Sequence, residues 1–96
     1  MAASAILAAG TTAATSSAVT LADGASTNLV VFEAAGGSIP ADAVFEVKIK
    51  NSVGGYTAIA RLTGGVFATG IVGPGEFYVD RKFTGASGAS LGVDQN

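Results

Sequence analysis

The chain has 96 residues, a formal net charge of −2, no cysteine and no histidine. This length allows one small domain, and the two missing residue types remove the thiol nucleophile, the commonest general base and the usual zinc ligands. The five Lys and Arg residues are scattered between residues 48 and 82, and only Arg81 and Lys82 are adjacent, whereas nucleic-acid binding needs clustered cations.

Two features of the composition favour a protein that packs against neighbours. Alanine supplies much of the 49% hydrophobic content, so the core is thin, and charged residues make up 12% of the chain against about 25% in an ordinary soluble domain. Small domains without disulfides are commonly stabilised by oligomerisation or docking. The alternative is a soluble monomer with a bland surface.

The first segment, residues 1–16, is rich in Ala, Ser and Thr and carries no charge. It superficially resembles a signal peptide, but no Lys or Arg precedes its apolar part, and "AILAA" is too short for one. We interpret it as an extended N-terminal arm that becomes ordered only in an assembly, where Thr11, Thr12 and Thr15 would add a strand to a neighbour. Residues 17–96 then form a single β domain.

Short runs of β-branched and aromatic residues, separated by turn residues, recur through the rest of the chain. They predict about seven antiparallel strands, at residues 17–21, 27–33, 43–50, 56–62, 66–72, 76–83 and 89–93. Residues 43–62 read as a hairpin with a five-residue loop, and Pro74-Gly75 fits a type II turn. The predicted fold class is all-β, a small β-sandwich or jelly roll with an extended N-terminal arm.

Period-two alternation predicts the core. Phe45, Val47 and Ile49 share one face of their strand, and Phe77 and Val79 share one face of the strand at 76–83. Phe83 and Arg81 have the same parity as Phe77. Because Arg81 is near the strand end, its aliphatic chain is expected to pack along apolar surface while its guanidinium head points outward.

Candidate chemistry is sparse. The carboxylates are spread along the chain. Glu76 and Asp80, on one strand face, are the candidate acid pair; the alternative, which we favour, is the polar face of an ordinary half-buried strand. Asp23 and Asp42 lie in turn-like contexts and are expected to cap backbone N–H groups.

Tyr56 and Tyr78 could stack on a sugar, but packing at the core edge or an interface fits them better. We expect no catalytic residue, no cofactor and no metal site. The carboxylates are Asp23, Glu33, Asp42, Glu46, Glu76, Asp80 and Asp94.

Three segments resemble small virion proteins of tailed bacteriophages: "SSAVTLADGASTNLVVF", "IPADAVFEVKIKNSVGGYTAIARLTG" and "GPGEFYVDRKFTGASGASLGVD". The resemblance covers roughly residues 12 to 94. It lies in a first strand of the form V-x-L-x-x-G-x-S, a polar G-x-Y hairpin, a G-P-G-x-[FY]-x-V-x-[RK] strand and a final G-V-D.

The resemblance implies a non-enzymatic virion structural protein, a capsid cement or decoration protein that binds and stabilises the head shell. Its partners would be the major capsid protein and copies of itself, as a homo-oligomer. It would be made in the bacterial host cytoplasm and end on the phage head surface, without contact to nucleic acid or membrane. The alternative is a receptor- or glycan-binding module of a tail fibre or adaptor.

Overall fold

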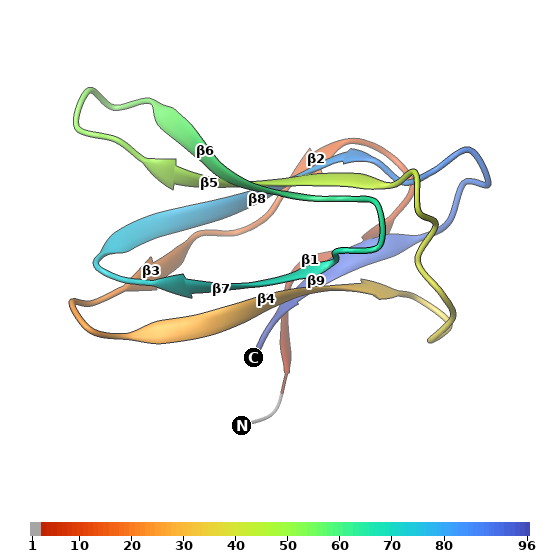
Figure 1. Cartoon of the computed structure of the whole chain (residues 1–96), viewed down its shortest axis with the longest axis horizontal. Coiled ribbons are helices and arrows are strands. Elements are labelled where there is room, and N and C mark those ends of the chain that lie inside the picture. Colours follow the sequence, from red (N-terminus) through yellow and green to blue (C-terminus); the bar gives the residue numbers. More distant parts are fainter. Residues whose placement is uncertain (1–2) are drawn as a thin grey trace.

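The computed structural model describes residues 3–96 and shows a two-layer β-sandwich (Figure 1). One sheet has the order β1-β9-β4-β7. Its strands are β1 (Ser4–Gly10), β4 (Ser26–Glu33), β7 (Ala68–Val72) and β9 (Leu91–Gln95). The other has the order β2-β8-β5-β6, with β3 also paired to β8. Its strands are β2 (Ala14–Thr15), β3 (Val19–Leu21), β5 (Val44–Lys50), β6 (Tyr56–Leu62) and β8 (Gly75–Phe83).

The all-β prediction is confirmed, and each of the seven expected strands is present with small shifts at its ends. β5 and β6 form the expected hairpin around residues 51–55, where the Asn51 side chain accepts hydrogen bonds from the Val53 and Gly55 N–H groups. The prediction of a type II turn at Pro74-Gly75 is wrong. Gly75 does not have the positive φ which that turn requires; it is instead the first residue of β8.

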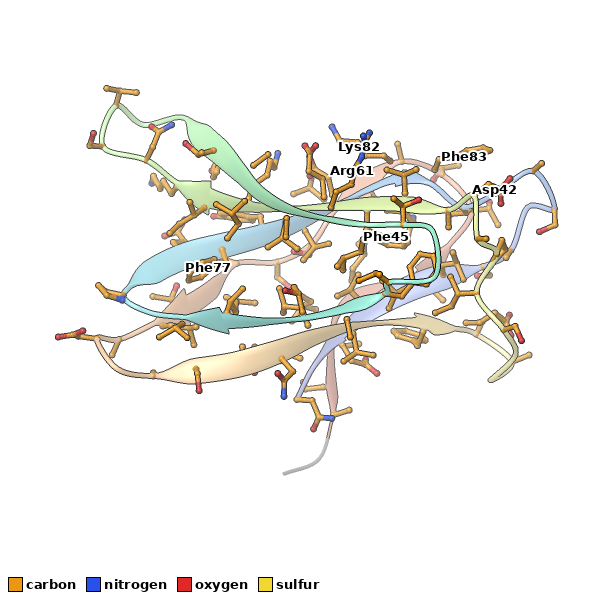
Figure 2. The ribbon with its side chains drawn as sticks, viewed as in Figure 1. Asp42, Phe45, Arg61, Phe77, Lys82 and Phe83 are labelled. Atoms are coloured by element: carbon orange, nitrogen blue, oxygen red, sulfur yellow. The ribbon has the colours of Figure 1, made fainter. Side chains whose placement is uncertain are left out.

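The core lies between the two sheets and is built from alternate residues of their strands. Phe45, Val47 and Val79 are fully buried, Phe77 is nearly so, and Ile49 packs against them from the edge. Figure 2 shows Phe45 and Phe77 pointing into the space between the sheets. The predicted register of both strands is therefore confirmed for these residues.

Phe83 departs from the predicted parity and is 47% exposed. In the pairing of β5 with β8, Phe45 lies opposite Arg81 and Val44 lies opposite Phe83, so Lys82 is an extra residue. Such a β-bulge reverses the faces of the residues beyond it. Phe83 consequently follows Val44 to the outer side of the sheet (Figure 2).

The segment expected to be an N-terminal arm is instead part of the sandwich. β1 pairs with β9 in one sheet and β2 pairs with β8 in the other, and Ile6 belongs to the buried core. The prediction that the chain divides at residue 16 is therefore wrong for residues 4–15; residues 1 and 2 lie outside the described part. Here the segment adds strands to its own chain, because both sheets offer it an unpaired edge.

Arg81 explains why this segment is held in place. Its side chain is turned inward and only 5% exposed, which corrects the expectation that its head points outward. Nε donates to the Thr12 carbonyl at 2.6 Å, and Nη1 donates to the carbonyls of Ala8 at 2.9 Å and Leu91 at 2.8 Å. A buried guanidinium must have its donors satisfied, and here two backbone carbonyls of the N-terminal segment and one of β9 accept from it.

Candidate functional site: two unlike outer faces

The charged residues are divided unequally between the sheets. All five Lys and Arg residues lie on β5, β6 and β8, whereas β1, β4, β7 and β9 carry only Glu33 and Asp94. We call the outer side of the β2-β8-β5-β6 sheet the charged face. Figure 2 shows Arg61 and Lys82 on this side of the molecule. It presents Glu46, Lys48, Lys50, Tyr56, Arg61, Glu76, Tyr78, Asp80 and Lys82.

Asp80 is the centre of the charged face. It is 8% exposed, accepts a hydrogen bond from Thr15 Oγ1 at 2.7 Å, and pairs with Lys48 Nζ at 2.7 Å and Lys82 Nζ at 3.6 Å. Burial by itself raises the pKa of Asp80, but the hydrogen bonds from Lys48 and Thr15 and the two lysine charges outweigh burial and hold the pKa below its ordinary value. The carboxylate is thus fixed in its ionised form.

This arrangement makes stability depend on pH. Because the pKa of Asp80 is lowered on folding, its ionised form stabilises the protein above the ordinary value of 3.8, and this contribution is lost as the pH falls below that value. At about pH 7, Asp80→Asn is expected to be less stable than the wild type by about 1.5–3 kcal/mol. The difference should shrink as the pH falls below 3.8, because a protonated Asp80 carboxyl is neutral, as the asparagine amide is.

Thermal melting of both proteins across this range measures the difference. Asp23→Asn, at an exposed turn residue, is the matched control and should follow the wild-type profile. A constant gap between wild type and Asp80→Asn at every pH would contradict the assignment.

The two tyrosines singled out in the sequence lie next to each other on the charged face. Their ring centroids are 5.1 Å apart with an interplanar angle of 87°, an edge-to-face contact, and Lys48 Nζ lies 5.2 Å from the centroid of the half-exposed Tyr56 ring. The Tyr78 hydroxyl donates to Glu76 Oε2 at 2.6 Å, and this hydrogen bond raises the pKa of Tyr78 above its usual value. Perpendicular rings with a cation over one of them do not form a flat stacking platform.

The candidate acid pair is on one face, as the alternation indicates, but the two carboxylates have separate partners. Glu76 accepts from Tyr78, and Asp80 is bound to Thr15 and the two lysines. Across residues 3–96, no three carboxylates come together in the way that a metal site requires. The geometry therefore fits the polar face of a half-buried strand, in which each carboxylate has its own partners.

Two further carboxylates act on the backbone of turns. Glu33 Oε1 accepts from the N–H groups of Ala35 and Gly37, at 3.1 Å and 2.7 Å, and Asp42 Oδ2 accepts from the Ala86 N–H at 2.9 Å. The expected capping role of Asp42 is thus confirmed, and sequence reasoning missed the same role for Glu33. Both carboxylates organise loops.

The outer side of the β1-β9-β4-β7 sheet, which we call the weakly charged face, presents small and apolar side chains. Leu29 and Val31 are buried in the core, so alternation places Asn28, Val30 and Phe32 of β4 outside. The Phe32 ring packs onto β9 at Gly92, since a Cβ at Gly92 would lie 2.5 Å from Phe32 Cζ. This face contains no cation, and Asp94 is its one charged residue among the described strands once Glu33 is engaged in its turn.

The described residues include no helix that is long and apolar enough to cross a membrane. Comparison of the chain with protein-family models, with curated proteins and with solved structures gave no match.

Proposed function

We propose that the protein is a non-enzymatic virion structural protein of a tailed bacteriophage, a capsid cement or decoration protein that binds and stabilises the head shell. The observation that carries the proposal is the division of charge between the two faces. The major capsid protein and further copies of this chain would be its partners, on the surface of the phage head.

The division of charge fits a subunit that is covered on one side. Burying a face without cations costs little desolvation, whereas burying the charged face would strip water from Lys50, Arg61 and Lys82. The charged face in turn keeps an attached subunit hydrated. Small side chains such as Ala68 let a neighbouring surface approach closely, and the Phe32 ring packs onto Gly92 of its own sheet. The weakly charged face is therefore the proposed contact to the shell.

The alternative proposal is a receptor- or glycan-binding module of a tail fibre or adaptor, which would use the Tyr56–Tyr78 pair. The edge-to-face geometry and the Lys48 ammonium over Tyr56 give this proposal weaker support. Aromatic platforms for sugars or bases depend on an open ring face.

Particles assembled without the protein distinguish the two proposals. A cement protein is expected to leave them sensitive to heat and osmotic shock but able to adsorb to cells, and adding the purified protein should restore resistance. A receptor module would give the reverse pattern, with adsorption lost and also abolished by the double substitution Tyr56→Ala and Tyr78→Ala.

Add-back of charge variants then tests which face binds. Asn28→Lys places a cation on the weakly charged face, and we expect occupancy on the shell to fall by at least about tenfold, because the new charge must be desolvated. Ala58→Lys makes a similar change at an exposed residue opposite Lys48 on the charged face, and should bind normally. Equal binding by both variants would contradict the proposed contact.

A further inference from the structure

The strand β7 forms one edge of its sheet. Residues 68–72 pair with β4 on one side, and no strand of the described chain pairs with the other side (Figure 1). Unpaired N–H and C=O groups along such an edge are a template for a further strand.

Two hydrogen bonds show which backbone groups of β7 are free. The Val31 N–H donates to the Phe67 carbonyl and the Gly73 N–H donates to the Ala25 carbonyl, at the two ends of the pairing with β4. Antiparallel strands alternate between residues that bond to the partner and residues that face away from it. Ala68, Gly70 and Val72 therefore direct their N–H and C=O groups away from β4, and all are exposed, Val72 to 65%.

β7 lacks the features that usually protect an edge. It contains no charge and no proline, and its register with β4 has no bulge. The other edges are protected. β1 has irregular register with β9, β6 carries Arg61 and an irregularity opposite Val47 and Lys48, and β2 and β3 are only two and three residues long. The single long, regular and uncharged edge among the described strands is thus β7.

We infer that β7 is the site at which two copies of this chain pair, antiparallel about a two-fold axis at Gly70. In this register Gly70 lies opposite Gly70 of the second copy, and Ala68 lies opposite Val72 of the second copy. Each of these residues directs its backbone groups to the free side, so every pair exchanges two hydrogen bonds.

β7 is complementary to itself in this register. We therefore take its partner strand to be β7 of a second copy of the chain. Ala68 faces the larger Val72 of the second copy, the two-fold axis passes between two glycines, and no like charges face each other. Pro74, two residues after the end of β7, has no N–H and limits the ladder to β7 itself. The pairing joins two four-stranded sheets into one continuous sheet across the two-fold axis.

This inference does not depend on binding to a shell, because it concerns the isolated protein. Its failure would leave the proposed contact of the weakly charged face untouched, and failure of the shell contact would leave this interface in place.

Sedimentation of the purified protein tests the inference. The wild type is expected to reach twice the chain mass of 9.3 kDa as its concentration rises. Gly70→Asp and Gly70→Lys each place two like charges directly opposite one another, and each should raise the dissociation constant of the dimer by about tenfold or more. A Cβ at Gly70 meets only the Asn28 amide oxygen, at 3.4 Å, so both monomers should fold.

An equimolar mixture of Gly70→Asp and Gly70→Lys is expected to recover the dimer as a heterodimer, because the charges pair only when residue 70 faces residue 70. Ala58→Asp and Ala58→Lys, at the exposed edge strand β6, are the matched controls and should dimerise like the wild type. A wild type that stays monomeric, Gly70 variants that dimerise normally, or a mixture without recovery would each overturn the inference.

Discussion

Replacing Phe45 with alanine is expected to leave the isolated protein largely unfolded at room temperature. Phe45 is fully buried at the centre of the core, and truncation of such a residue typically costs ~3–5 kcal/mol. Stability of about 0.05–0.15 kcal/mol per residue gives a chain of this size about 5–14 kcal/mol, and its thin, alanine-rich core places it at the low end of that range. Phe77→Ala, at a residue 2% exposed, should behave in the same way. Thermal and urea denaturation followed by circular dichroism measure both.

Phe83→Ala is the matched control, because it removes the same atoms from a half-exposed residue. Phe83 follows the bulge of β8 and lies on the outer side of the sheet. Its melting temperature should change little. If Phe45→Ala retained the wild-type melting curve, or if Phe83→Ala unfolded the protein, the placement of the core and of the bulge would both be wrong.

Replacing Arg81 with methionine is expected to release the N-terminal strands and destabilise the whole domain by about 3 kcal/mol or more, since each hydrogen bond to a charged group contributes about 1.5–3 kcal/mol. Methionine fills much of the same space but leaves the carbonyls of Thr12, Ala8 and Leu91 without their donor. Hydrogen exchange should show faster exchange in residues 4–15 than in the β5–β6 hairpin, and the melting temperature should fall.

Two control variants separate the hydrogen bonds of Arg81 from its charge. Arg61→Met removes an exposed arginine from the charged face and should have little effect on stability. Arg81→Lys keeps the charge but has a single nitrogen in place of the guanidinium fork, so it should recover only part of the loss. Unchanged exchange protection of residues 4–15 in Arg81→Met would contradict the role assigned to this side chain.

The sequence was sufficient for the strands whose residues alternate clearly. Glu46, Lys48 and Lys50 lie on the outer side of β5 while Phe45 and Val47 are buried, and this alternation predicts the strand and its core residues. It failed for "SAILAAG", where Ile6 is the one β-branched residue and nothing alternates. β1 is a strand because β9 offers it a partner, which is tertiary information that a local pattern does not contain.

The wrong prediction of an N-terminal arm and the wrong orientation of the Arg81 guanidinium have the same cause. An arginine on the apolar face of a central strand requires acceptors, and the only signal for them in the sequence was that requirement itself. The need of a buried guanidinium for acceptors predicts that a backbone segment near β8 supplies carbonyls. The uncharged N-terminal segment was available for this role.

The candidate surfaces were predictable in part. Alternation places Lys48, Tyr78 and Asp80 on the polar faces of their strands, but it gave no face for Tyr56. The mutual contacts of these residues follow once β5, β6 and β8 are neighbours. That neighbourhood is a matter of strand order, which period-two patterns do not determine. For the same reason the sequence could not assign all cations to one sheet, nor identify β7 as an unprotected edge.

The position of β9 has a consequence for synthesis of the protein. This strand lies between β1 and β4, although it is made after every other described strand. While the ribosome is still translating residues before 91, β1 has no partner in its sheet and β4 is paired on one side only. The β5–β6 hairpin can form early, because its contacts are local, but the sandwich closes only when the last strand emerges. Until then the nascent chain exposes Leu29 and Val31, and it is in this interval that chaperone binding or aggregation would compete with folding.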